Sequence, residues 1–330
     1  MKKSKTLTVD DASYVSCRID NFVHEKCDYL SREHVKRKIS AGDIRLNDQI
    51  VKASKSLHVG DVITVTYDIP DVTEPVFIKI IFEDENMIII DKPAHMSCHP
   101  SSRHLTYNVL AQMKSAYPQS NFRLLHRLDR ETSGLLMLSK HKTIHQRVSR
   151  LFEERKIYKE YRALTYGKIQ KSNGSIVKMI VDDTSSEIRI KKTTVDDGVG
   201  ATPRGCPITN YELIRYIGDF SLLKIIPKTG KQHQIRVHLA SIGYPIVGDK
   251  IYGLNERFFL DYVEDRGTMH CVPTSDDLIF DRHALHASRI AFTHPMTGES
   301  IDIDINPDNS LMWLPAGTED MLKNRLNSNK

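Results

Sequence analysis

Hydrophobic and polar residues alternate with strand-like spacing over much of the chain, and helical spacing is confined to a few short segments. The run at 135–138 is continuously apolar and follows a glycine, which predicts a short buried strand. Apolar segments at 77–82 and 87–90 flank a polar Glu-Asp-Glu-Asn sequence, which indicates a hairpin. Further strand-like segments lie at 161–169, 208–217 and 220–230.

Two segments in this larger part of the chain have the spacing of a helix. Residues 143–156 place Val148, Leu151 and Phe152 in phase. A second helix is expected to start near Lys231, with Thr229 and Gln232 in capping-box spacing and Gly243 at its end. Strands outnumber helices and seldom alternate with them. We therefore expect an α+β fold built on a mostly antiparallel mixed sheet, rather than a doubly wound parallel sheet.

The first part of the chain, residues 15–68, has the pattern of a separate small α+β unit. A first helix carries Ile19, Phe22 and Val23 on one face. A second helix has Ser31 as its expected N-cap and ends before Gly42. A strand, an Asn-Asp turn at 47–48, another strand and a final alternating strand should follow.

Domain boundaries follow from composition and from a length of 330 residues, which is enough for two domains. The segment around 68–76 contains Pro70, Pro75 and several acidic residues, as linkers often do. We predict a small domain at 1–70, a linker at 71–76, a larger domain at 77–310 and a C-terminal tail at 311–330.

The formal net charge of +5 is compatible with a polyanionic partner but does not identify one. The second predicted helix carries four basic residues: Arg32, Lys36, Arg37 and Lys38. Such a set can be a solvated helix face, or it can contact a phosphate backbone without reading bases. The pattern alone leaves both interpretations open.

Several classes of protein can be set aside. The longest apolar runs are too short to cross a membrane, and the charged N-terminus lacks the apolar core of a secretory signal. The five cysteines are scattered and form no CxxC pair, so we expect a reduced, cytoplasmic protein without a disulfide framework or a structural zinc site. The spacing of the histidines favours no metal site, and the sequence near 227–233 lacks the pattern of a phosphate-binding NTPase loop.

The candidate chemistry lies in two places. Asp129 stands between Arg127 and Arg130, just before the apolar run at 135–138. A second cluster of Lys231, His233, Arg236 and His238 falls on the later helix, where Arg236 lies off the buried stripe. A guanidinium there could reach a carboxylate and favour its charged form. An ionised aspartate of this kind is either a structural partner or a nucleophile or base.

The sequence HRLDRETSG, residues 126–134, is very similar to the HRLD-x-x-TSG signature of RluA-type pseudouridine synthases. Segments around 80–100, 159–167, 229–253 and 282–299 resemble the other motifs of that family and occur in the family's order. The N-terminal unit resembles the small RNA-binding domain named after ribosomal small-subunit protein S-four, also called the alpha-L motif. An ordered set of matches is far more specific than any one motif.

This resemblance implies roles for individual residues. Asp129 would be the nucleophile or base that starts cleavage of the uridine glycosidic bond, and Arg236 would pair with it. Arg127 would fill the space left by a flipped-out uridine, and Tyr161 would stack on its uracil and help to remove the carbon 5 proton. Other residues expected to contact RNA are His126, Lys231 and His233, together with the four basic residues of the second helix. No metal or cofactor is required, because the reaction breaks and remakes one bond without redox change.

The chain departs from the family pattern at two places, where substrate contacts could differ. His95 stands where the family usually has glycine, and Lys231-Gln232 stand where it usually has Arg-Thr. The implied partner is RNA, with large-subunit ribosomal RNA first and transfer RNA second, and a monomer is expected. A non-catalytic RNA-binding or ribosome-assembly protein on the same fold is the main alternative. A hydrolase with an aspartate nucleophile is disfavoured, since no second catalytic carboxylate occurs in a motif.

Overall fold

The chain divides into two compact units in a computed structural model that describes residues 2–27, 32–68, 76–100, 107–195, 205–264, 279–306, 309–315 and 317–322. The first unit comprises Met1–Ile78 and Met96–Phe122, and the second comprises Lys79–His95 and Arg123–Lys330. Residues 96–122 thus group with the N-terminal part of the chain. The domain boundaries expected at residues 70 and 77 stay a prediction.

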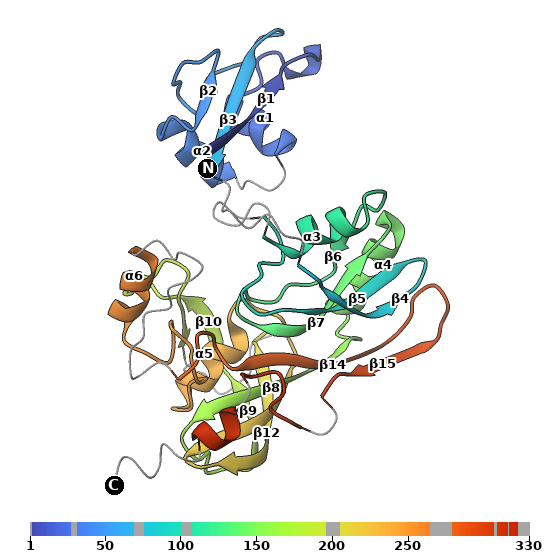
Figure 1. The fold of residues 1–330 in the computed structure, drawn as a ribbon, viewed down its shortest axis with the longest axis vertical. Helices are drawn as coiled ribbons and strands as arrows, with labels where there is room; N and C mark the ends of the chain where they lie inside the picture. Colours follow the sequence, from blue (N-terminus) through green and yellow to red (C-terminus); the bar gives the residue numbers. More distant parts are fainter. Residues whose placement is uncertain are drawn as a thin grey trace. The chain divides into compact units, whose positions relative to one another are not determined.

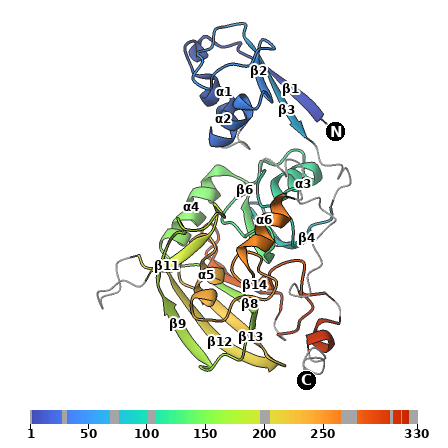
Figure 2. The ribbon, with the colours of Figure 1, turned by 90° about the vertical axis from the view of Figure 1, so that its left-hand side faces the viewer.

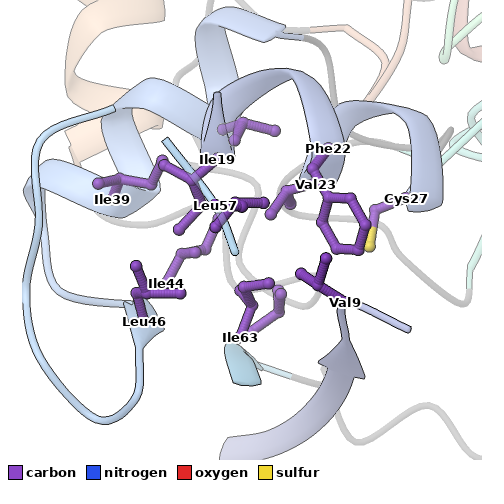
Figure 3. Close-up of a cluster of buried hydrophobic side chains, with 12 residues drawn as sticks. Val9, Ile19, Phe22, Val23, Cys27, Ile39, Ile44, Leu46, Leu57 and Ile63 are labelled. Carbon is purple, nitrogen blue, oxygen red and sulfur yellow. The ribbon is translucent and has the colours of Figure 1, made fainter. Parts of the chain in front are cut away.

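The first unit contains a three-stranded antiparallel sheet, in the order β1-β3-β2, and helices that cover it. Its buried core brings together Ile19, Phe22 and Val23 from the first helix with Ile39 from the second and Ile63 from the sheet (Figure 3). The elements are β1 (Lys2–Thr8), a 3-10 turn (Ala12–Tyr14), α1 (Ile19–Lys26), α2 (Arg32–Ser40), β2 (Ile44–Leu46), β3 (Val62–Asp68) and α3 (Val109–Ala116).

The two N-terminal helices are confirmed, but two details of this unit differ from the expectation. The chain turns at Asn47 and Asp48, both at positive φ, yet the segment that follows forms only one bridge, between Leu46 and Gln49, rather than a second strand. The first strand, β1, was not expected, because its lysine-rich sequence gives only a weak apolar alternation. The expected cap Ser31 lies outside the described residues.

The second unit is built on one large sheet, to which ten strands of the described ranges belong (Figure 1). The strand order is β4-β5-β7-β14-β8-β13-β12-β9, with β15 beside β14 and β6 beside β7. The strands are β4 (Lys79–Glu83), β5 (Met87–Lys92), β6 (Arg123–Leu124), β7 (Ser133–Ser139), β8 (Tyr158–Tyr166), β9 (Asn173–Val177), β12 (Ile208–Ile217), β13 (Phe220–Pro227), β14 (Leu285–Thr293) and β15 (Ser300–Asp304). The remaining elements are α4 (Lys142–Glu153), β10 (Met179–Asp182), β11 (Lys192–Val195), α5 (Gln234–Ser241) and α6 (Glu256–Glu264).

The expected α+β class with a mostly antiparallel mixed sheet is confirmed. Among the described strands of the large sheet, only β7 and β14 pair in parallel. The predicted hairpin forms from β4 and β5, and the apolar run at 135–138 lies in β7, where every residue is buried. Ile144 and Val148 of α4 pack into the same core as Leu135 and Met137, which explains the helical spacing of that segment.

Two local features hold the strand β7 in place. Gly134 has φ +106°, and a Cβ at this position would lie 2.2 Å from the carbonyl oxygen of Ala287 on β14. Only glycine therefore allows the close parallel approach of the two strands. Ser133 Oγ lies 2.9 Å from Nδ1 of His286 on β14, so a side-chain contact supports the same junction.

The helix α5 starts later than the sequence indicated, at Gln234, with His233 in the left-handed region as its N-cap. The proposed Thr229–Gln232 capping box is wrong. Thr229 Oγ1 instead donates to Gln234 Oε1 at 2.6 Å, and the N–H of Lys231 donates to the same oxygen. The helix packs against β12 and β13 (Figure 2), and this fixed start determines where Arg236 lies.

The described residues of the predicted tail pack against the rest of the second unit. Leu314 and Leu322 are buried, and Arg215 on β12 forms two hydrogen bonds with the carboxylate of Glu319. Trp313, the only tryptophan in the sequence, stacks on His286 with ring centroids 5.5 Å apart. Its fluorescence should therefore report unfolding of the second unit.

Candidate active site

The loop between β6 and β7 carries the sequence HRLDRETSG and is fixed from both sides. Lys92, fully buried at the end of β5, donates hydrogen bonds to the backbone carbonyls of Pro93 and Arg130. His126 Nε2 accepts a hydrogen bond from the backbone N–H of Met137. Thr132 closes the turn by donating its N–H to the carbonyl of Asp129. Asp129 therefore sits on a rigid loop rather than on an open surface turn.

Arg236 is shared between two carboxylates. Its Nη1 donates to Asp129 Oδ2 at 2.8 Å, while its Nε and Nη2 form a two-pronged pair with Asp249 at 2.7 and 2.8 Å. Arg236 and Asp249 are both buried, whereas 29% of the Asp129 side chain is exposed. The bidentate contact fixes the plane of the guanidinium, and the third contact then fixes Asp129.

Electrostatics keep Asp129 ionised. Burial alone would raise the pKa of its carboxyl, but the charge of Arg236 outweighs burial and holds the pKa below its usual value. The pKa of Asp249 is lowered in the same way, and that of Arg236 is raised well above its usual value by the two carboxylates despite its burial. An aspartate held ionised and oriented in this way can act as a nucleophile or as a base.

Asp249 also organises the loop after α5. Its Oδ1 accepts hydrogen bonds from the backbone N–H groups of Ile251 and Tyr252 at 3.0 and 3.1 Å. The Tyr252 ring lies under the guanidinium of Arg236, 5.1 Å from centroid to Cζ, and its hydroxyl lies 2.9 Å from His233 Nδ1. One carboxylate thus positions both the arginine and the aromatic ring that packs against it.

A second ionic group lies two residues after Asp129. Lys250 Nζ contacts Glu131 Oε1 at 2.9 Å, and the backbone N–H of His283 donates to Glu131 Oε2 at 3.2 Å. His283 Nε2 also lies 2.7 Å from Thr132 Oγ1. Burial opposes ionisation of Glu131, but Lys250 and its other charged neighbours lower its pKa to about 2. Adjacent residues 249 and 250 therefore position both acids of this loop, Asp249 indirectly through Arg236 and Lys250 by direct contact.

Asp129 lines a cleft of about 920 Å³ within the second unit. Tyr161 and Leu285 belong to the same lining, Tyr161 from the middle of β8 and only 8% exposed. Besides Arg236, six lysine or arginine residues line the cleft: Arg127, Arg155, Lys156, Lys159, Lys228 and Lys231. The cleft thus combines an aromatic ring, an ionised carboxylate and a positively charged rim, the combination needed to receive a nucleotide from an RNA strand.

The structure brings most of the predicted site residues together. Asp129, Tyr161 and Arg236 lie in one cleft with Arg127, His126, Lys231 and His233. Arg127 and Lys231 are exposed, but His233 is buried, with its Nε2 4.0 Å from Asp129 Oδ2. The helix α2 belongs to the other unit. There Lys36 and Arg37 are exposed, while Arg32 pairs with Asp20 and Lys38 with Asp43.

Four residues in or beside this site were missed in the sequence. They are Lys159, Asp249, Lys250 and Glu131. Asp249 had a readable signal, because it is an acid that closely follows the apolar residues Pro245–Val247, but nothing local shows that Arg236 is its partner. His95, a departure from the family pattern, adopts φ +63°, which explains why glycine suits this position. Its Nε2 contacts Asp281 Oδ2 at 3.0 Å.

Comparisons with known proteins identify the family of this chain. A family model described as RNA pseudouridylate synthase matches residues 86–241. The RNA pseudouridine synthase YlyB of Bacillus subtilis is 30% identical, over 87% of this chain and 89% of the relative. The ribosomal large subunit pseudouridine synthase C of Buchnera aphidicola is 32% identical, over 87% of this chain and 88% of the relative. The solved structure of human RNA pseudouridylate synthase domain containing 1 aligns with a TM-score of 0.53 at 25% identity, over 71% of this chain and 85% of that one.

The chain therefore belongs to the RNA pseudouridine synthase family and is an isomerase that converts uridine in RNA to pseudouridine. No helix within the described ranges combines the length and the apolar character that crossing a bilayer requires.

Buried or half-buried histidines in and around the site make the fold sensitive to acid. Burial lowers the pKa of His126, His283 and His286 to about 3 and that of His233 to about 4. These groups bind protons near pH 6.5 only after unfolding, so the folded state loses stability as the pH falls below 6.5. Each histidine should cost on the order of 1 kcal/mol at pH 5.5, and the four together several kcal/mol.

We therefore predict that the free energy of unfolding falls by about that amount between pH 7.5 and pH 5.5. Urea titrations followed by Trp313 fluorescence measure it. In His283→Gln the loss over this range should be smaller by about a quarter. A stability that stays level from pH 7.5 to 5.5 would contradict the assignment of neutral buried histidines.

Proposed function

We propose that this synthase modifies uridine in large-subunit ribosomal RNA and that Asp129 starts the reaction as nucleophile or base. The observation that carries the proposal is the contact between Arg236 and Asp129. Within the described residues, both polar contacts of the Asp129 carboxylate go to Oδ2, so Oδ1 has no hydrogen-bond donor to weaken it. An ionised oxygen of this kind in a cleft suits attack on, or proton removal from, the ribose of a bound uridine.

The target base must leave its stack to reach Asp129. A uridine within an RNA stem is inaccessible, so the nucleotide is turned out into the cleft and the gap is filled. We assign the filling role to Arg127, which is exposed on the same loop, two residues before Asp129. Tyr161 offers its ring as the stacking surface for the uracil and can help to remove the carbon 5 proton. The exposed cations of the rim then contact the neighbouring phosphates.

The assignment to ribosomal RNA rests on the relatives. Several of them are named ribosomal large subunit pseudouridine synthases, and at about 30% identity they align over most of this chain. Transfer RNA is the alternative that the experiment below distinguishes. A purely RNA-binding role is disfavoured, because a carboxylate held ionised at the floor of a basic cleft would repel phosphate and would serve no purpose in binding.

The direct test compares two aspartate substitutions in a tritium-release assay on RNA labelled at carbon 5 of uridine. The wild-type protein should release tritium from a large-subunit ribosomal transcript and not from transfer RNA. Asp129→Asn keeps the side-chain shape but cannot form an ester or accept a proton, so its rate should fall by at least about three orders of magnitude. Its RNA affinity should be unchanged or higher, since a negative charge is lost.

The matched control is Asp219→Asn, the same change at an exposed acid that pairs with Lys168 outside the cleft. It should retain the wild-type rate. Asp129→Asn with normal tritium release would remove the catalytic assignment. Tritium release from transfer RNA and not from the ribosomal transcript would mean that transfer RNA is the substrate.

The N-terminal unit is proposed to add affinity without reading sequence. Lys36 and Arg37 are exposed on α2, in the part of the chain that resembles an alpha-L RNA-binding domain, and two further basic residues of this helix already have acidic partners. The exposed pair is therefore assigned to contact phosphate.

Replacing both residues with serine should flatten the plot of log binding constant against log salt concentration by about 1.5, because each phosphate contact contributes about 0.7–0.9. Filter binding to the ribosomal transcript between 50 and 300 mM salt measures this slope. Lys52→Ser with Lys55→Ser removes the same charge from exposed positions outside the helix and should change the slope less. If both double substitutions reduce the slope equally, the effect is one of total charge, and the assignment of phosphate contacts to Lys36 and Arg37 is wrong.

A further inference from the structure

Lys159 differs from the other cations of the cleft. The rim residues Arg127, Arg155, Lys156, Lys228 and Lys231 are exposed, but Lys159 is only partly accessible. Its ammonium lies 5.7 Å from the centroid of the Phe152 ring, and it is 3.7 Å from the place that a Cβ on Gly230 would occupy. The Lys159 ammonium therefore lies in the cleft wall, near the Phe152 ring and the backbone of Gly230.

The strand β8 directs its own acid away from this ammonium. Successive side chains of a strand point to opposite faces, so Lys159 and Tyr161 share one face while Tyr158, Glu160 and Arg162 share the other. On that other face Glu160 pairs with Arg162 and accepts a hydrogen bond from the Tyr158 hydroxyl. Within the described residues, no carboxylate lies within ion-pairing distance of Lys159.

We expect the substrate to supply the negatively charged partner of the Lys159 ammonium. Burial lowers the pKa of Lys159, and no acid among the described residues counteracts this effect. Residues two apart on a strand are separated by roughly 6.6 Å, which a lysine side chain can span. A uracil stacked on Tyr161 would therefore lie within reach of the ammonium, whereas the exposed rim cations are better placed for phosphates.

We propose that Lys159 is a catalytic residue that contacts the flipped uracil and stabilises the negative charge of the ring while it is detached from the ribose. When the bond between N1 and carbon 1′ breaks, its electron pair stays on the uracil and spreads onto the ring oxygens. Carbon 5 then forms the new bond to carbon 1′ and loses its proton, while N1 gains one, so the product is an isomer of the substrate. A fixed cation beside the ring lowers the energy of this charged intermediate. The proposal depends on the proposed cleavage that Asp129 initiates.

The test measures the single-turnover rate at saturating protein, together with RNA affinity, on a large-subunit ribosomal transcript. Lys159→Met should lower this rate by about 100-fold or more, the usual effect of losing one charge-stabilising group, and change the dissociation constant by less than about threefold. Lys159→Arg keeps a cation and should recover part of the rate. Lys168→Met, the same change at an exposed lysine outside the cleft, should retain the wild-type rate.

A second substrate separates a chemical role from a structural one. In a transcript made with 5-fluorouridine triphosphate in place of UTP, the fluorine itself stabilises charge on the detached ring. The deficit of Lys159→Met, measured as disappearance of fluorouridine, should therefore shrink at least tenfold relative to the uridine transcript. Equal deficits on both transcripts would mean that Lys159 acts only through structure and would overturn the proposal.

Two further results would also overturn it. The first is a weaker binding constant with an unchanged saturating rate, which would make Lys159 a phosphate contact. The second is an unchanged rate and affinity. The rate of Asp129→Asn, measured in parallel, distinguishes a failure of this proposal from a failure of the proposed cleavage. A loss of activity in Asp129→Asn beside a normal Lys159→Met would reject the role of Lys159 alone, whereas a normal Asp129→Asn would reject the proposed cleavage and this role with it.

Discussion

The proposed active site depends on one guanidinium that binds two carboxylates. Asp249 binds Arg236 through two hydrogen bonds and so fixes its plane, and the remaining nitrogen of the group then holds Asp129. All three residues would be costly to bury alone, because a buried unpaired charge destabilises a fold by several kcal/mol. Together they satisfy one another, and the arginine keeps the Asp129 carboxylate, which lines the cleft, in its ionised form.

The sheet places these charges where they can meet. Gly134 allows β7 to lie beside β14, which sets the loop of Asp129 next to the residues that precede β14, including His283. The neighbouring strand β8 directs Tyr161 into the cleft, and the fixed start of α5 delivers Arg236. Residues far apart in sequence therefore converge because the strands are ordered β7-β14-β8. The site residues lie at the ends of these strands and on the face of β8 that carries Tyr161.

Much of this could be predicted, and the failures have physical causes. Apolar periodicity identified β5, β7, α1 and α4, since burial imposes the pattern directly. Asp129 and Arg236 were found through motifs, which carry local information. The start of α5 was misplaced, because Gln234 caps the turn through tertiary contacts with Ile208 and Thr209 that no local pattern shows. Asp249, Lys250 and Glu131 were missed for the same reason: their partners are distant in sequence.

The most direct test of the central claim is the pH dependence of the single-turnover rate in Arg236→Gln, measured between pH 5.5 and 8 under conditions where far-UV circular dichroism shows a folded protein. Arginine holds the pKa of Asp129 low, so the wild-type rate should have no acid limb caused by this carboxyl in that range. Without the cation, burial alone acts on the carboxyl and raises its pKa. The account predicts a lower rate for Arg236→Gln that rises with pH across the range. A rate with the same pH dependence as the wild-type enzyme would contradict it.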